Sequence, residues 1–370
     1  MADQETLVES YFRIYEEQLK EKNAPIVLLM QAGDFYEMYV YHNEDTDEWY
    51  GSNLYDLKDI LRCNKITVKS ALKPNERGDK PSMWGFPVSV YDTYCNLLSS
   101  ENYIVIRMDQ VKDDKGKVID RLITEQVTPG TYISRLDDLC DTESNNISCL
   151  YLNKYYDRTK MKEKISYGYS NINSYTGDTD IFEGRTESMY MDSTILNDLD
   201  RYFINNNPKE ILLVSNLNEK EKSKIRNCLG ISDCLIRDYK SNDVVVKNIL
   251  KITNIEEVIC RVFGDKKEFF CELEWFHLGT TSLVFLIEYI NKYNPLSVNK
   301  LNLPKHESIS NKVLLENHTL QQLNIVDDLV TSSKIKKRTS SLINFLNNCL
   351  TMSGKRLLKE AFVNPTTDID

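Results

Sequence analysis

The chain has 370 residues, of which 41% are hydrophobic and 10% aromatic, and this is enough apolar material for two or three globular domains. Its net charge of −10 argues against a protein that coats nucleic acid indiscriminately, although local basic patches can still bind DNA. No stretch is long and apolar enough to span a bilayer, and the N-terminus is acidic and polar, so neither a membrane span nor a secretory signal is expected.

The nine cysteines are scattered and form no Cys-x-x-Cys pair, and the four histidines do not cluster with them. A zinc site is therefore not predicted. Free thiols favour an intracellular, reducing compartment. The composition, rich in Lys, Asn, Ile and Tyr, suggests an AT-rich genome, and it does not distinguish a nucleus, an organelle or a viral replication site.

The first segment has apolar residues at helical spacing over 3–22, and Pro25 separates this helix from the next element. An apolar run at 26–31 predicts a buried strand. Gly33 then permits a tight turn, and the chain is expected to return through a second strand over 35–40.

Two side chains of this second strand attract attention because Phe35 and Glu37 stand two positions apart and should project to the same side. An apolar wedge can unstack and kink a duplex from the minor groove. A carboxyl group beside the wedge can hydrogen-bond the edge of a displaced base. Tyr36 and Tyr39 are expected to point the other way, into the domain.

The rest of this α+β unit is predicted to contain a polar loop, a helix, an exposed loop and a hairpin turn before it ends near Ile133. These are expected at 42–49, 54–61, 73–80 and 113–116, respectively. Lys65 and Lys69, with Lys73 nearby, form one candidate basic patch, and 154–164 and 334–338 are two others.

A second unit is expected after a polar, acidic linker at 134–145. Its pattern predicts a three-stranded meander, then a helix, then a buried strand. The segments are 148–152, 165–172 and 180–182, with a turn at 176–178, followed by 193–205 and 211–214.

Three carboxylates of this unit, Asp178, Asp180 and Glu183, lie close together in the sequence. A two-metal nuclease needs carboxylates that converge on its metals. These residues stand in and just after a hairpin turn, where acidic side chains usually bond the local backbone. A metal nuclease is therefore the weaker interpretation.

From about residue 248 the pattern becomes helical, with an apolar helix predicted over 278–293. Gly354-Lys355 is the one phosphate-loop lookalike. A P-loop needs a glycine five residues before Gly354 and a Ser or Thr after Lys355, and Cys349 and Arg356 occupy these positions. No nucleotide site is predicted in this chain.

Several segments, in order along the chain, resemble landmarks of the MutS family of DNA mismatch repair proteins. Phe35-Tyr36-Glu37 resembles the family's Phe-x-Glu mismatch reader. The segments are Gly33 to Met38, Met83-Trp84-Gly85-Phe86-Pro87, Asp109-Gln110, Thr128-Pro129-Gly130-Thr131, and 341–358, which resembles a landmark of the core domain.

The chain also departs from the family pattern at three of these places. Gln31 stands where relatives usually have Arg or Lys, and Ser89 stands where His is expected. Asp109 replaces the usual Glu. The Phe-x-Glu pair is intact, whereas some packing and phosphate contacts of the family are in question.

The resemblance implies an α+β multidomain fold. It implies a small mixed α/β mismatch-binding domain at 1–133, a ribonuclease-H-like connector domain at 146–247, and a mostly helical core/lever domain at 248–370 that is incomplete. In the family the ATPase domain follows, so this chain is not expected to be an enzyme, and ATP and Mg²⁺ are expected only for that domain. A truncated or split gene product is favoured.

The function implied is recognition of mismatched or unpaired DNA. Phe35 would insert and stack, Glu37 would hydrogen-bond the base, Gly33 would permit the turn, and Lys65 and Lys69 would contact phosphates. The expected partners are double-stranded DNA with a mismatch or small loop and a MutS-type ATPase subunit or C-terminal half, and no membrane. Two alternatives stay open: binding of branched DNA without mismatch specificity, and binding of a partner ATPase subunit.

Overall fold

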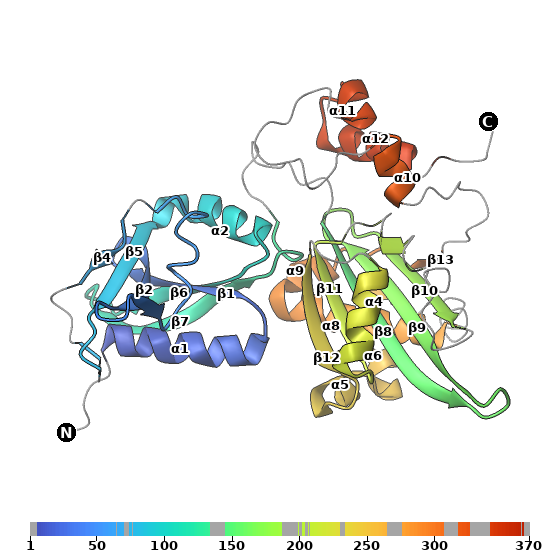
Figure 1. Cartoon of the computed structure of the whole chain (residues 1–370), viewed down its shortest axis with the longest axis horizontal. Helices are drawn as coiled ribbons and strands as arrows, with labels where there is room; N and C mark the ends of the chain where they lie inside the picture. Colours follow the sequence, from blue (N-terminus) through green and yellow to red (C-terminus); the bar gives the residue numbers. More distant parts are fainter. Residues whose placement is uncertain are drawn as a thin grey trace. The chain divides into compact units, whose positions relative to one another are not determined.

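The chain forms two compact units, Met1–Asp138 and Leu139–Asp370, each with its own sheet and helices (Figure 1). This computed structural model describes residues 6–63, 65–69, 74–75, 77–133, 145–186, 199, 202–203, 206, 208–229, 234–264, 276–306, 317–325, 341–363 and 365. The mixed α/β composition agrees with the predicted α+β class. Within the described residues no helix is both long and apolar enough to cross a membrane.

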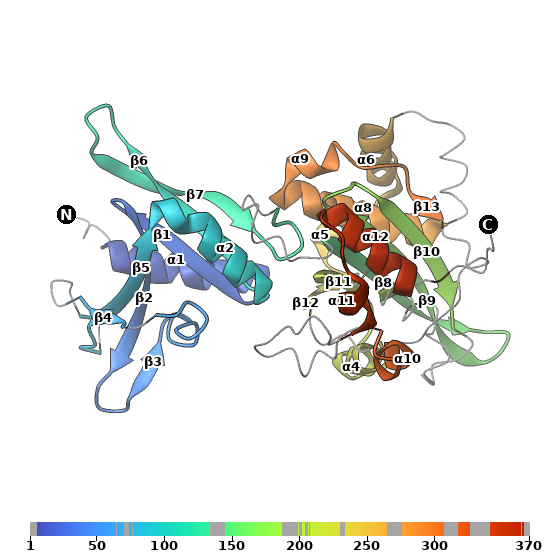
Figure 2. The same cartoon turned by 90° about the horizontal axis from the view of Figure 1, so that it is seen from above.

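The first unit is a mixed sheet with one helix on each face (Figure 1). The strands lie in the order β4-β5-β2-β1-β6-β7, and β3 pairs with β2. Figure 2 shows the β2–β3 and β6–β7 hairpins extending from the sheet in different directions. The elements are α1 (Leu7–Lys22), β1 (Ile26–Ala32), β2 (Phe35–Asn43), β3 (Glu48–Tyr50), β4 (Thr67–Val68), β5 (Pro81–Pro87), the 3₁₀ turn η1 (Val88–Val90), α2 (Tyr91–Ser100), β6 (Ile104–Lys112) and β7 (Val118–Val127).

The helix α1 has defined ends that the sequence encodes. Thr6 caps its first turn by accepting a hydrogen bond from the Glu9 N–H, and the Glu9 side chain accepts one from the Thr6 N–H. At the other end Asn23 adopts a left-handed conformation with φ of 48°. Pro25 then prevents continuation. The predicted helix is confirmed.

The central strand β1 is buried on both faces between an antiparallel neighbour, β2, and a parallel one, β6. Val27 and Leu29 join the apolar cluster beneath α2, with Cys95 and Leu98 of that helix. Alternation sends Ile26 and Leu28 to the opposite face, where α1 lies. A continuous apolar run is therefore needed at this position.

The helix predicted over 54–61 is wrong. This segment is a series of turns. The N–H groups of Leu57 and Leu61 donate to carbonyl groups four residues back, whereas those of Lys58 and Arg62 donate to carbonyl groups three residues back. The expected apolar face is nevertheless buried, since Leu57 and Leu61 are fully enclosed. The spacing correctly predicted which side chains are buried. The backbone is not a helix, because it lacks a continuous series of i→i−4 hydrogen bonds. The 42–49 loop is shorter than expected because β2 and β3 extend into it.

The second unit is built on a sheet in the order β12-β11-β8-β9-β10-β13. β8, β9 and β10 form the predicted antiparallel meander, and β11 and β12 add parallel strands beside β8. The elements are β8 (Asn146–Asp157), β9 (Lys162–Asn173), β10 (Thr179–Arg185), β11 (Glu210–Ser215), α4 (Glu219–Cys228), β12 (Leu235–Lys240), α5 (Val244–Ile249), α6 (Ile252–Phe263), α8 (His277–Tyr293), α9 (Pro295–Val298), β13 (Lys305–His306), α10 (Asn317–Gln322), α11 (Leu342–Leu346) and α12 (Met352–Val363).

The helix α8 packs directly on this sheet. Glu183 of β10 accepts hydrogen bonds from the N–H groups of Leu278 (2.8 Å) and Gly279 (3.3 Å) at the start of the helix. A Cβ at Gly168 of β9 would lie 2.1 Å from the Leu278 carbonyl oxygen, so only glycine allows this approach. Arg237 of β12 donates to the Tyr289 hydroxyl (2.6 Å), which ties the far end of α8 to the sheet.

The apolar side chains of α6 and α8 belong to the same core as strands β8, β10 and β11. The sequence pattern places these helices in the domain beginning at residue 248, whereas their packing continues the fold of the preceding strands. The division into three domains stays a prediction, because the compact units number two. Most of the helix predicted at 193–205 and the linker at 134–145 lie outside the described residues.

The predicted landmark at 341–358 forms α11 and most of α12. Thr351 precedes α12, and its Oγ1 accepts a hydrogen bond from the Gly354 N–H (3.2 Å). A Cβ at Gly354 would lie 3.2 Å from that same Oγ1. The threonine and glycine of the motif therefore act together to start a helix, and Gly354-Lys355 lies inside that helix.

Candidate nucleic-acid interface

The turn between β1 and β2 presents Phe35 to solvent. Ala32 pairs with Phe35, so Gly33 and Asp34 are the two turn residues, and Gly33 has a φ of 65° that favours glycine. Phe35 is 47% exposed. Among the described residues of the first unit, no other aromatic residue is as exposed. A large aromatic group is thus held outside the core on a two-residue turn.

Hydrogen bonds from neighbouring strands brace this turn. The Gln31 side chain donates to the Gly33 carbonyl (3.1 Å) and accepts from the Gln110 N–H (2.8 Å). Arg121 donates to the Gln31 carbonyl oxygen (3.0 Å), and the Val88 N–H donates to the Asp34 carbonyl (3.0 Å). A Lys or Arg at position 31 has no acceptor for the Gln110 N–H. The departure from the family pattern therefore has a structural role here.

Glu37 lies on the same face as Phe35, as predicted, but it is mostly covered. Its side chain is 13% exposed, its Oε2 accepts a hydrogen bond from the Tyr39 hydroxyl, and its Oε1 lies 3.6 Å from the Lys69 Nζ. Tyr39 is buried in the domain, as predicted, but the face predicted for it is wrong: residues two apart share a face of a strand, so Tyr39 lies on the side of Glu37. Strand alternation applied to position 39 would have found this contact.

Gly85 of β5 makes room for the Glu37 side chain. Glu37 and Gly85 are direct cross-strand partners. A Cβ at Gly85 would lie 2.5 Å from the Tyr36 carbonyl oxygen and 3.3 Å from the Glu37 Cγ. Two segments that resemble family landmarks are therefore adjacent strands, and the glycine of one accommodates the glutamate of the other.

Tyr36 anchors the opposite face of β2, as predicted. It is buried, and its hydroxyl donates to Asp109 (2.6 Å), which also accepts from Thr124 (2.6 Å) and pairs with Arg107 (3.0 Å). Burial raises the pKa of Asp109, but the hydrogen bonds from Thr124 and Tyr36 and the charge of Arg107 outweigh it and hold the pKa below its ordinary value. This network fixes the strand from behind.

The predicted phosphate contacts differ in their surroundings. Lys65 is exposed, whereas Lys69 pairs with Glu37. In the second predicted patch Lys154 pairs with Glu163 and Glu221, both at 2.9 Å, so its charge is compensated. The third patch, 334–338, lies outside the described residues. Of the two predicted phosphate contacts, Lys65 is the more available to a phosphate, because Lys69 pairs with Glu37.

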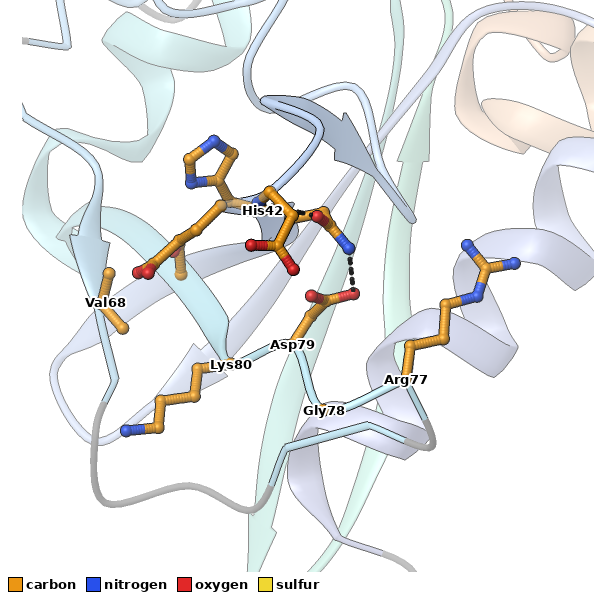
Figure 3. A pocket seen from close by; sticks show the side chains of 10 residues that line it. His42, Val68, Arg77, Gly78, Asp79 and Lys80 are labelled. Carbon is orange, nitrogen blue, oxygen red and sulfur yellow. Dashed lines mark hydrogen bonds between the residues drawn. The ribbon is translucent and has the colours of Figure 1, made fainter.

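The sequence did not indicate a polar pocket that lies beside the β2–β3 hairpin (Figure 3). Arg77 and Lys80 point to different sides of it, and Asp79 accepts from Asn43 (3.5 Å). The remaining lining is also of mixed charge, and it includes His42, Glu44 and Asp45. Such a lining defines no single class of ligand.

The acidic residues Asp178, Asp180 and Glu183 do not form a metal site. Asp178 accepts from the Thr176 hydroxyl (2.7 Å) and lies 3.5 Å from the Lys305 Nζ, while Glu183 caps α8. Across the part of the chain that the structure describes, no group of three or more potential ligands is placed to hold a metal.

Comparison with known proteins assigns this geometry to a class. Residues 10–135, which include the turn, β5 and the β6–β7 hairpin, match the family model of MutS domain I. The chain is 24% identical to a mutS homolog of Acanthamoeba polyphaga mimivirus, covering 98% of this chain and 33% of that protein. It is 26% identical to the DNA mismatch repair protein MutS of Prochlorococcus marinus (strain AS9601), over 95% and 35%, and 25% identical to that of Fusobacterium nucleatum, over 98% and 35%.

The chain belongs to the MutS family. It spans about a third of the length of the curated relatives it matches. The first unit is the part that the domain model covers, and it contains Gly33, Phe35, Glu37, Lys65 and Lys69.

Proposed function

We propose that the chain binds duplex DNA at a mispaired or unpaired base, as the recognition part of a DNA mismatch repair protein. The observation that carries the proposal is the exposed Phe35 on a braced two-residue turn, with Glu37 on the same face. Burying an aromatic side chain in the core would be the ordinary outcome. Its exposure on a rigid support suits insertion into a base stack.

In this proposal Phe35 enters from the minor groove and stacks on the displaced base. Stacking of an aromatic side chain on a base is worth about 1–3 kcal/mol. Unstacking a step costs a few kcal/mol and is least costly where pairing is already weak. The gain and the cost are of similar size, so a matched duplex resists insertion and a mispaired one accepts it.

The remaining site residues have supporting roles. Glu37 hydrogen-bonds the edge of the base on which Phe35 stacks, and Gly33 permits the turn. Lys65 contacts a phosphate, which is compatible with a net charge of −10 because only the local charge needs to be positive.

We also infer that residues 146–247, within the second unit, form a connector domain with a ribonuclease-H-like fold. The sheet supports this: an antiparallel meander, β8-β9-β10, is extended beside β8 by the parallel strands β11 and β12. Asp178, just before β10, accepts a hydrogen bond from the Thr176 hydroxyl, and Glu183 of β10 accepts one from the Leu278 N–H. The inference therefore assigns the unit a connecting role without nuclease chemistry.

The test is fluorescence-anisotropy binding of the full chain to a matched duplex and to one with a single unpaired thymine. The wild type should prefer the bulged duplex, and Phe35→Ala should lose about 1–3 kcal/mol of that preference, or about 5- to 150-fold in affinity. Tyr156→Ala is the matched control, because Tyr156 is a 53% exposed aromatic of the second unit. Equal binding to both duplexes, unchanged by Phe35→Ala, would refute the proposal.

A second candidate function is binding of a partner protein through the helical segment after residue 341. Phe345 of α11 and Leu357 of α12 are 60% and 68% exposed, so these two neighbouring helices present apolar surface that a partner can cover. An ATPase subunit of the same family is the partner we propose. This binding is compatible with DNA recognition by the first unit.

A further inference from the structure

The carboxylate of Glu37 is held at both of its oxygens. The Tyr39 hydroxyl donates to Oε2, and the Lys69 ammonium lies 3.6 Å from Oε1. We call these three residues the Glu37 cluster. The cluster links β2 to Lys69, the residue after β4. The strand β5 lies between β2 and β4, and its Gly85, opposite Glu37, has no side chain to block this contact.

Tyr39 is a rigid donor in this cluster. Its ring is buried and packs edge-on against Tyr11, with ring centroids 5.2 Å apart. Burial and the hydrogen bond to the Glu37 carboxylate raise the pKa of the Tyr39 hydroxyl far above its ordinary value, so the hydroxyl keeps its proton. Glu37 therefore meets a fixed O–H on one side and, on the other, the ammonium of a flexible lysine side chain that is 38% exposed.

This arrangement decides which base edges Glu37 fits. Both neighbours are hydrogen-bond donors, so the carboxylate acts as an acceptor, and its two oxygens have about four acceptor sites in total. The sites left over are acceptors as well. Thymine and guanine present a ring N–H on the pairing edge, whereas adenine and cytosine present a bare ring nitrogen there.

We propose that Tyr39 and Lys69 are positioning residues that make Glu37 a fixed acceptor, so the site selects an unpaired base with a ring N–H, thymine or guanine. This inference rests on the proposed function, since it concerns the base on which Phe35 stacks. Tyr39 sets the orientation of the carboxylate. Lys69 offsets its charge near the phosphates, and it remains on Glu37 instead of contacting the DNA backbone.

The test uses two bulged duplexes that differ only at the unpaired base, thymine in one and N3-methylthymine in the other, together with the matched duplex. The methyl group removes the ring N–H and leaves a stacking surface. A hydrogen bond to a charged group is worth about 1.5–3 kcal/mol, so the wild type should bind the thymine bulge at least about tenfold more tightly than the methylated one.

Tyr39→Phe should reduce this ratio towards one while the preference for a bulge over a matched duplex persists. Tyr11→Phe is the matched control, because it removes a neighbouring buried hydroxyl that donates to the Leu28 carbonyl and leaves the Glu37 cluster intact. It should leave the ratio unchanged. Lys69→Met, a change at a half-exposed side chain, should also reduce the ratio and gives a second variant if Tyr39→Phe unfolds.

The outcomes separate the two proposals. A bulge preference that depends on Phe35, with a thymine to N3-methylthymine ratio that neither Tyr39→Phe nor Lys69→Met changes, overturns the inference and leaves the proposed function standing. A wild-type ratio of one in the presence of that preference also overturns the inference. Absence of any bulge preference overturns both.

Discussion

Replacement of Gly85 by alanine tests whether the space beside Glu37 matters. The added Cβ would lie 2.5 Å from the Tyr36 carbonyl oxygen, a backbone atom that cannot rotate away, and 3.3 Å from both the Cα and the Cγ of Glu37. Contact at 2.5 Å is well inside van der Waals separation. Either β5 moves away from β2, or Glu37 is displaced.

We expect Gly85→Ala to lower the free energy of unfolding of the first unit by about 1–3 kcal/mol, the usual cost of overpacking a well-packed site. The matched control is Gly116→Ala in the β6–β7 turn. Gly116 has a φ of 78°, and its added Cβ would meet no atom within 4 Å. This control should cost about 1–2 kcal/mol through backbone conformation alone. The two variants thus have similar stability losses with different causes.

The readouts are urea unfolding followed by tryptophan fluorescence, since Trp49 and Trp84 both lie in the first unit, and binding to the three duplexes. Gly85→Ala should lose discrimination between the thymine and N3-methylthymine bulges, whereas Gly116→Ala should retain it. A Gly85→Ala protein with wild-type unfolding and wild-type discrimination would show that the close approach of β5 to β2 has no consequence.

Three further predictions concern charges. Lys65→Met should make the dependence of log affinity on log salt concentration shallower by about 0.9, as expected for loss of one phosphate contact. Lys69→Met should leave this slope unchanged. A shallower slope for Lys69→Met would identify Lys69 as a phosphate contact. Glu183→Gln keeps an acceptor at the α8 N-terminus but removes the negative charge, so chemical denaturation should report a loss of about 0.3–1 kcal/mol, and an unchanged free energy of unfolding would contradict a helix-dipole role. The folded-state pKa of Asp109 is below its ordinary value, so its contribution to stability is present above the unfolded-state pKa and is lost as the pH falls towards the folded-state pKa. Asp109→Asn should therefore flatten the acidic part of the stability–pH profile. An unaltered profile would refute the stabilising role of the Asp109 carboxylate.

Local patterns predicted much of the first unit. The capped helix, the apolar run of β1, the glycine turn and the shared face of Phe35 and Glu37 all follow from spacing and from the conformational freedom of glycine. The segment 54–61 shows where this reasoning stops. Helical spacing of leucines found the buried face, but tertiary contacts placed those leucines in the core without a regular helix.

The contacts that define the site could not be predicted in the same way, because they join residues distant in sequence. Lys69 reaches Glu37 across β5, and Gln31 meets Gln110 from β6. No local pattern fixes which strands are neighbours. The pairing of Lys69 with Glu37 depends on the strand order β4-β5-β2, which the sequence does not reveal. From sequence alone, Lys69 is therefore predicted to contact a phosphate.

The parallel pairing of β1 with β6 has a consequence for when the β1–β2 turn becomes rigid during folding. The β1–β2 hairpin is local and can form early, since few residues separate its strands. Its brace at Gln31 comes from Gln110, and β6 joins β1 only after a connection of about 70 residues has closed. During synthesis the turn therefore emerges well before it becomes rigid. A nascent chain that has reached β5 holds Phe35 on a hairpin paired with β5 but without the contacts from Gln110 and Arg121, which arrive with β6 and β7.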